Sequence, residues 1–288
     1  MQSTFKHLFE FAVEQLKEAN IEGHREESLL LLSKMMAIDQ SYIIARMEEE
    51  VPDEFDINQY EQLVKRRALR EPFAYLFNEC EFYNRSFSVG PGVLIPRPET
   101  EHLIETVLEE HQHQNFKKVV DLCSGSGIIA ITLQLELEIE TCVVDVSNEA
   151  LQWAKKNVQQ YELSNKCKII ECDILQSLPD AVIDADCITM NPPYICHSDC
   201  QNLSKDITEY EPHLALFGGD NQGLSFTLKV LERLAEKVHN GTQIFIELGY
   251  NQKSLLESQT LYPWAIQNWK KDLAGIHRIV HLKKIHNG

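Results

Sequence analysis

Between residues 119 and 247 the chain alternates short apolar runs with longer segments of helical periodicity. The apolar runs cover residues 119–122, 141–145, 167–170, 187–190 and 243–247. The helical segments that separate most of them span residues 128–137, 148–161 and 224–238. Strands that alternate with helices at this spacing form parallel βαβ units, so the pattern predicts an α/β fold: a doubly wound parallel sheet with helices on both faces. The stretch 264–285 is expected to complete the sheet with further strands.

The first 75 residues have a different pattern, which predicts a small helical bundle. Apolar residues recur there at steps of three and four, Ser3 or Thr4 can cap the first helix, and a later helix begins after Asp56. From 75 to 93 the sequence alternates as a strand does, and glycine and proline punctuate its end. We therefore expect a helical domain at 1–75, a β-hairpin connector at 76–95 and an α/β domain at 96–288.

Charge and composition exclude several classes of protein. The 288 residues include 27 Lys and Arg against 44 Asp and Glu, a net charge of −17. Binding to nucleic-acid phosphates needs a basic surplus, so we expect no direct nucleic-acid contact. No apolar run is long enough to cross a membrane, and we see no signal peptide at the N-terminus. We expect a cytoplasmic monomer without membrane contact.

The eight cysteines form no Cys-x-x-Cys pair, which indicates buried, reduced thiols. The nearest approach to a metal cluster is the stretch 196–200, Cys-His-Ser-Asp-Cys. Structural zinc sites use two ligand pairs at set spacings, and no second pair is present. We interpret this stretch as a loop and expect no metal site.

A glycine-rich turn follows the first strand of the α/β domain. It comprises Cys123, Ser124, Gly125, Ser126 and Gly127, directly before a predicted helix. Such a turn lets a ligand approach the backbone, and the helix start offers unpaired N–H groups. The spacing differs from the dinucleotide fingerprint Gly-x-Gly-x-x-Gly and favours an adenosyl ligand.

Two acidic residues end the next two strands. Asp145 lies about 20 residues beyond the glycine-rich turn, where a carboxylate can accept both ribose hydroxyl protons. Asp173 follows the third strand and can accept from an adenine amino group, with Ile174 packing on the ring. A single Asp at a strand end is commonly a turn residue, but acids at successive strand ends favour a nucleoside site.

The fourth strand ends in the most specific motif of the chain, Asn191-Pro192-Pro193-Tyr194. The two prolines fix the backbone, so that the Pro192 carbonyl and the Asn191 side-chain oxygen can both accept from one amino group. Two acceptors that hold its N–H groups orient the nitrogen lone pair toward an electrophile. Tyr194 supplies an aromatic wall. The motif predicts methyl transfer to a planar amide or aromatic amine.

Together these motifs resemble those of class I amino methyltransferases that use S-adenosylmethionine. Further segments resemble the HemK/PrmC family of release factor glutamine N5-methyltransferases; they are residues 71–76, 81–83, 91–101, 211–216 and 272–275. The resemblance implies a Rossmann-like catalytic domain, S-adenosylmethionine as cofactor, and methylation of the glutamine in the Gly-Gly-Gln loop of bacterial peptide chain release factors. It implies that Asn191, Pro192 and Tyr194 act in catalysis and that Asn191 to Tyr194 bind the substrate. The helical domain, which matches the family in length and position, is expected to dock the substrate.

The chain departs from the family's sequence pattern at one position, and three alternative functions remain open. The family usually has glycine where this chain has Cys123, and a side chain there can crowd the methionine moiety. A ribosomal-protein glutamine methyltransferase shares the Asn-Pro-Pro-Tyr motif, and a DNA adenine N6-methyltransferase also presents an exocyclic amine to such a pocket. A binding module that has lost turnover is the third alternative, against which the intact Asn191 and Asp145 argue.

Overall fold

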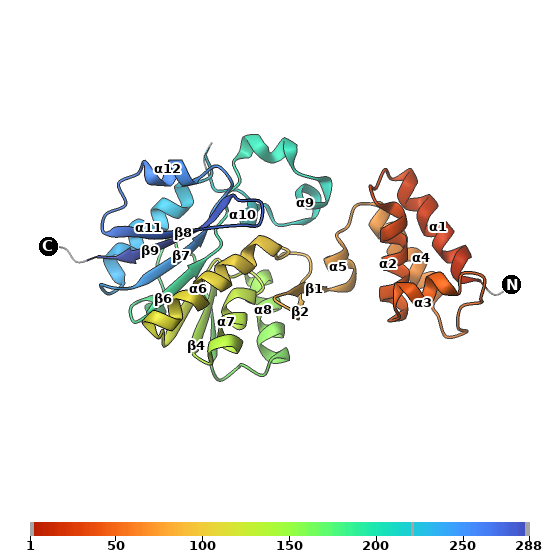
Figure 1. The fold of residues 1–288 in the computed structure, drawn as a ribbon, viewed down its shortest axis with the longest axis horizontal. Coiled ribbons are helices and arrows are strands. Elements are labelled where there is room, and N and C mark those ends of the chain that lie inside the picture. The colour runs from red at the N-terminus through yellow and green to blue at the C-terminus, as the bar shows by residue number, and fades with distance from the viewer. Residues whose placement is uncertain (1–2, 220–221, 286–288) are drawn as a thin grey trace. The chain divides into compact units, whose positions relative to one another are not determined.

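The computed structural model describes residues 3–219 and 222–285 of the chain. The chain divides into two compact units, Met1–Phe77 and Asn78–Gly288. Figure 1 shows the helices of the first unit in red and orange, and the sheet and helices of the second unit in yellow to blue.

The first unit consists of helices that enclose a core of their own. They are α1 (Phe5–Glu18), α2 (His24–Met36), α3 (Gln40–Ala45), α4 (Ile57–Ala68) and α5 (Phe73–Phe77). Thr4 caps α1 by accepting from the His7 N–H, and Asp56 caps α4 by accepting from the Gln59 N–H. The apolar faces of α1, α2 and α4 meet around Leu16 and Tyr60, both fully buried.

The junction between the units differs from the sequence prediction. Residues 75–77, predicted as the start of a strand, belong to helix α5: the Pro72 carbonyl accepts from the N–H groups of Tyr75 and Leu76, and both side chains are buried. The hairpin is shorter than predicted: β1 (Glu79–Phe82) pairs antiparallel with β2 (Arg85–Ser88). Gly90 and Gly92, which the sequence indicated as turn residues, lie after the hairpin. The turn of the hairpin is formed by Tyr83 and Asn84, both at positive φ. Turns of this kind usually contain glycine, so its sequence signal was weak.

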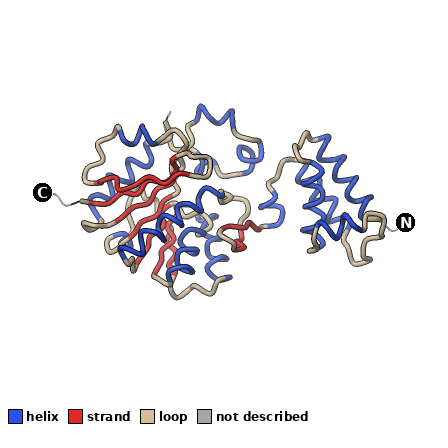
Figure 2. The backbone as a smooth tube through the Cα atoms, viewed as in Figure 1, coloured by secondary structure: helices blue, strands red, loops and turns tan. Residues whose placement is uncertain are grey.

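A seven-stranded sheet forms the centre of the second unit. Its strands are β3 (Lys118–Leu122), β4 (Glu140–Asp145), β5 (Cys167–Glu171), β6 (Cys187–Met190), β7 (Gln243–Glu247), β8 (Trp264–Lys271) and β9 (His277–Lys284). The spatial order is β5-β4-β3-β6-β7-β9-β8; β3 to β7 are parallel, and β9 pairs antiparallel with both β7 and β8. The sheet is drawn in red in Figure 2. The strand order reverses at β3, where open α/β sheets bind their ligands.

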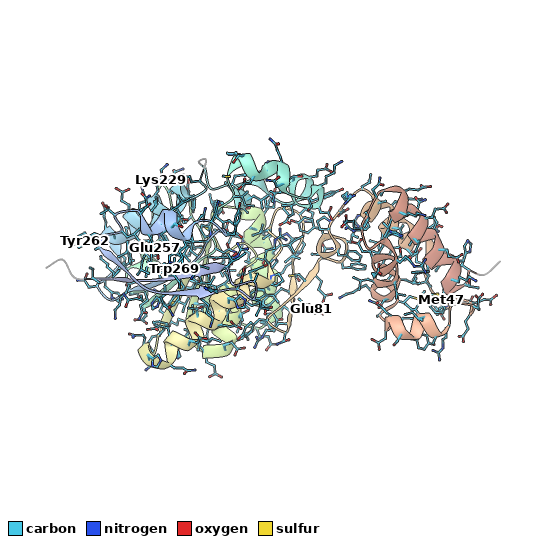
Figure 3. All side chains as sticks on the ribbon, turned by 45° about the horizontal axis from the view of Figure 1, so that its top comes forward. Met47, Glu81, Lys229, Glu257, Tyr262 and Trp269 are labelled. Carbon is cyan, nitrogen blue, oxygen red and sulfur yellow. The ribbon has the colours of Figure 1, made fainter. Side chains whose placement is uncertain are left out.

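Helices cover both faces of the sheet, as the sequence predicted. One face packs on α6 (Glu101–Gln114), α7 (Ile128–Leu137) and α8 (Asn148–Gln160); the other packs on α11 (Ser225–Lys237) and α12 (Lys253–Glu257). Successive residues of β3 alternate between the two cores, Val119 in one and Val120 in the other. Lys253 on α12 bonds Glu257 and lies 5.1 Å from the ring of Trp269 on β8; Figure 3 labels the last two.

The remaining short elements follow the parallel strands or precede α6. They are η1 (Pro98–Thr100), η2 (Asp180–Val182), η3 (His197–Asn202), α9 (Lys205–Tyr210) and α10 (His213–Leu216). The stretch 196–200, predicted as a loop, forms most of η3. Every helix within residues 3–219 and 222–285 is too short or too polar to span a lipid bilayer.

Candidate active site

A cavity lies where strands β3, β4, β5 and β6 end; about 1010 Å³ of space lies within its walls and in the open solvent at its mouth. Residues from seven separate segments of the second unit line it: Gly92, Val93, Leu94, Pro96, Thr100, Cys123, Ser124, Gly125, Ser126, Ile128, Ile129, Val144, Asp145, Val146, Ser147, Ala150, Cys172, Asp173, Ile174, Asn191, Pro193, Pro212, Leu214, Ala215 and Phe226. The lining brings together most of the residues that the sequence predicted as a site. Three predicted residues, Gly127, Pro192 and Tyr194, are not part of the lining.

The glycine-rich turn is held in a left-handed conformation. Cys123, Gly125 and Gly127 have φ angles of 57°, 56° and 78°. The Ser124 hydroxyl accepts from the Val144 N–H and donates to the Asp121 carbonyl, which fastens the turn to β4. A Cβ on Gly127 would lie 3.3 Å from Ala154, so this glycine allows α7 to pack closely on α8. Gly127 therefore shapes the turn from outside the cavity.

Asp145 joins the end of β4 to that turn. One carboxylate oxygen accepts from the Gly125 N–H at 2.8 Å, and the other accepts from the Ser147 N–H at 2.9 Å. Burial raises the pKa of this carboxyl, and the backbone N–H groups act against that shift. Each oxygen keeps a lone pair for a further donor. The carboxylate can thus accept two hydroxyl groups of a ligand in the cavity.

Asp173 and Ile174 lie beside it, after β5. The Asp173 carboxylate accepts from the Leu175 N–H and the Gln176 side-chain amide, so it also holds its own turn. Ile174 is 5% exposed, and it packs into the core while it lines the cavity. A planar ring can pack on this side chain.

The Asn-Pro-Pro-Tyr motif extends from the end of β6. Asn191 and Pro193 line the cavity, and Pro192 is buried. The Asn191 amide nitrogen donates to the Thr100 hydroxyl at 3.3 Å. Within the described part of the chain no group donates to its oxygen, which is therefore available as an acceptor. The Tyr194 hydroxyl points to Glu247, to which it donates at 3.2 Å.

The sequence motifs assign no role to Thr100, Phe226 or Glu247. Thr100 belongs to the segment 91–101, which resembles the family without indicating a role for this residue. Phe226, near the start of α11, has no local signal. Glu247 ends an apolar strand and is 1% exposed. A carboxylate at the end of a buried strand was a usable signal, since buried acids need partners.

The segment before residue 95 is fixed over α8 and forms the outer wall. The Asn157 side chain bonds the N–H and the carbonyl of Ser88, and the Trp153 indole donates to the Pro91 carbonyl. A Cβ on Gly90 would lie 2.2 Å from the Trp153 ring, so only glycine fits there. This packing places Val93 and Leu94 at the cavity.

The residues of the cavity fit S-adenosylmethionine. Gly125 and the first residues of α7 line the cavity, and the first N–H groups of a helix have no acceptor within the helix. Two strand-end carboxylates suit ribose and adenine donors, and apolar side chains offer surface for the ring. Cys123 occupies the lining where a smaller residue would leave more room.

Comparisons with known proteins agree with this geometry. Two family models match the chain, the PrmC N-terminal domain over residues 7–77 and the methyltransferase small domain over residues 98–212. A release factor glutamine methyltransferase of Clostridium botulinum is 34% identical over 272 residues, which cover 93% of this chain and 95% of that protein. One from Koribacter versatilis is 33% identical over 278 residues (96% and 97%), and one from Staphylococcus aureus 30% over 282 residues (97% and 99%).

The sheet, the glycine-rich turn and the methyltransferase domain match define a class I methyltransferase with S-adenosylmethionine as its methyl donor. The full-length similarity is more specific. The chain belongs to the release factor glutamine methyltransferase family.

Proposed function

We propose that this protein methylates the side-chain amide nitrogen, N5, of the glutamine in the Gly-Gly-Gln motif of bacterial peptide chain release factors. The observation that carries the proposal is the Asn191 oxygen, an acceptor without a protein donor in the described residues, at the wall of a cavity suited to an adenosyl ligand. Relatives of the same length that are named for this activity support the substrate.

The cofactor site would be formed by residues 123–126, Asp145, Asp173 and Ile174. S-adenosylmethionine supplies an electrophilic methyl group when it is bound. Asp145 would accept the ribose hydroxyls, Asp173 would accept from the adenine amino group, and Ile174 would pack on the adenine. Gly127 contributes through the shape of the turn.

The chemistry of an amide explains the acceptors. An amide nitrogen is a poor nucleophile because its lone pair is delocalised into the carbonyl group. Asn191 Oδ1 and the Pro192 carbonyl would accept the two N–H groups, which orients the lone pair and favours the tetrahedral nitrogen of the transition state. The nitrogen would form its bond to the methyl carbon as the bond from that carbon to the sulfur of S-adenosylmethionine breaks, which leaves the neutral thioether, and the nitrogen would then release one proton to solvent. Tyr194 would limit the position of the amide.

The experiment that tests this proposal offers methyl-labelled S-adenosylmethionine with one macromolecule at a time. Purified release factor, ribosomal proteins and double-stranded DNA are incubated separately with the protein. We expect label only in the release factor. Label in a ribosomal protein would favour the sister activity, label in DNA an adenine methyltransferase, and label in none a binding module.

We also propose that the helical unit docks the release factor. Residues 1–75 carry nine Lys and Arg against fifteen Asp and Glu, which suits a partner with basic, RNA-binding surface. On α3, Tyr42 and Ile44 are 45% and 57% exposed and offer apolar contact. Ile44→Ser should raise the KM for intact release factor and leave the affinity for S-adenosylmethionine unchanged. Equal KM values would count against docking by this helix.

The proposed setting is the cytoplasm, with the protein acting as a monomer on a protein substrate. The eight cysteines are free, as expected in a reducing compartment. The net charge of −17 disfavours direct contact with nucleic acid.

A further inference from the structure

A chain of four side chains runs from the end of β7 to the cavity. The Thr100 hydroxyl donates to Glu247 Oε2 at 2.7 Å, and the Tyr194 hydroxyl donates to Glu247 Oε1 at 3.2 Å. Thr100 Oγ1 also lies 3.3 Å from the Asn191 side-chain nitrogen. Thr100 and Glu247 are each 1% exposed, so water cannot easily substitute for either partner.

The direction of each hydrogen bond in this chain follows from Glu247. Burial raises the pKa of Glu247, and the hydrogen bonds from the Thr100 and Tyr194 hydroxyls act against that shift and favour the carboxylate. A carboxylate can only accept, so the Thr100 proton points toward Glu247. The lone pairs of Thr100 Oγ1 then face Asn191, which must present its NH₂ group. The Asn191 oxygen is left on the opposite side of the amide. The orientation of an asparagine is set by such partners, because its two ends have the same shape.

We propose that Glu247 is a positioning residue for methyl transfer, which acts through Thr100 to fix the Asn191 amide with its oxygen toward the substrate. This inference rests on the proposed function, because it assigns Asn191 Oδ1 to the substrate amide. Glu247 does not line the cavity, so its effect passes through Thr100 and Tyr194.

The alternative role is a purely structural one, in which Glu247 only supports the end of β7. The two roles predict different behaviour for Glu247→Gln. The glutamine amide can place its NH₂ group against Thr100. Thr100 then donates to Asn191 instead, and the Asn191 amide turns and presents NH₂ to the substrate. The acceptor is thereby replaced by a donor, with almost no change in volume.

The test compares variants of the full-length protein with release factor as substrate. We expect Glu247→Gln and Thr100→Val each to lower kcat about 10- to 100-fold, with the Kd for S-adenosylmethionine changed less than twofold. Thr100→Ser keeps the hydroxyl and should retain most of the wild-type kcat. The double variant, which carries both Glu247→Gln and Thr100→Val, should be no slower than the slower single variant, because both changes interrupt one hydrogen-bond relay from Glu247 through Thr100 to Asn191.

Thr242→Val is the matched control. Thr242 is also fully buried, and its hydroxyl donates to the Ala185 carbonyl at 3.1 Å. This contact lies before β7, at the end of the strand opposite to Glu247. It should lose thermal stability, as Thr100→Val does, with kcat unchanged. Wild-type kcat in Glu247→Gln, or losses that multiply in the double variant, would overturn the relay.

A second readout needs no turnover. Nuclear magnetic resonance of the Asn191 side-chain amide should show a hydrogen-bonded NH₂ proton in the wild type that is lost in Thr100→Val and altered in Glu247→Gln. Identical Asn191 signals in all three proteins would overturn the relay. A wild type with no activity on release factor would instead count against the proposed function, and the relay would still be decided by these signals.

Discussion

The carboxylate of Asp145 accepts a hydrogen bond from the backbone N–H of Gly125 at 2.8 Å, so the acid at the end of β4 holds the glycine-rich turn in place. Asp145→Ala should weaken S-adenosylmethionine binding about 10- to 100-fold, because hydrogen bonds to a charged group contribute on the order of 1.5–3 kcal/mol. Titration calorimetry measures this.

Asp186→Ala is the control for that change. Asp186 also accepts from two backbone N–H groups, those of Lys117 and Lys118. It lies at the amino-terminal ends of the strands, away from the cavity at their carboxyl ends. We expect it to leave cofactor affinity intact. Unchanged affinity in Asp145→Ala would remove Asp145 from the site.

Cys123 lines the cavity in a conformation that suits glycine. Its φ of 57° is left-handed, which costs a non-glycine residue roughly 1 kcal/mol. Cys123→Gly should tighten S-adenosylmethionine binding, since it removes a side chain from the lining. Cys123→Val should weaken binding, because a β-branched residue tolerates this φ poorly. Weaker binding by the glycine variant in calorimetry would show that the thiol contributes to the site.

Arg97 and Glu211 connect two segments that line the cavity. Arg97 Nη2 lies 2.5 Å from Glu211 Oε1, and the Ile95 N–H donates to the other oxygen. The Glu211 side chain is 1% exposed and that of Arg97 30%, so solvent screens the pair in part. Arg97→Ala should lower unfolding stability by about 1–3 kcal/mol and raise the KM for release factor. A double-mutant cycle with Glu211→Gln checks this, and additive losses would show that the pair is not coupled.

Asp121 predicts a pH dependence of stability. It is fully buried; one oxygen accepts from Thr189 at 2.7 Å, and the other has no partner among the described residues. Burial raises the pKa of this carboxyl from 3.8 to about 7. The folded protein therefore holds a proton between about pH 4 and 7 that the unfolded chain has released. The stabilisation from that proton is lost as pH rises toward 7.

Asp121→Asn removes this titration. Denaturant unfolding of both proteins at pH 5 and pH 8 should show the wild type losing about 2–3 kcal/mol relative to the variant, because about two pH units separate pH 5 from the pKa of the folded state. A stability difference that is the same at both pH values would mean that Asp121 stays ionised throughout.

Local sequence patterns could predict the sheet but not every part of the site. Strands β3 to β7 are apolar runs of four to six residues, and Asp145 and Asn191 could be placed because the ends of parallel strands meet at one edge. The last three residues of helix α5, 75–77, were predicted as strand, since a helix of five residues shows too little periodicity to be told from a strand. Tyr194 was predicted as a wall of the pocket, and nothing in the sequence indicated that its hydroxyl bonds Glu247.

The contact between Thr100 and Glu247 could not be predicted. The two residues are 147 positions apart, and neither carries a local pattern that names its partner. The same holds for Glu211, which meets Arg97 across 114 positions. Hydrogen-bond partners of this kind follow from how segments pack, which a single sequence does not specify residue by residue.

The most direct test of the account locates the transferred methyl group. Release factor is incubated with S-adenosylmethionine and either the wild-type protein or Asn191→Ala, digested, and analysed by tandem mass spectrometry. The account predicts one added methyl group on the side-chain amide of the glutamine in the Gly-Gly-Gln segment. It also predicts that Asn191→Ala forms this product on the order of 10²–10³ more slowly. A methyl group on any other residue, or wild-type product formation by Asn191→Ala, would contradict it.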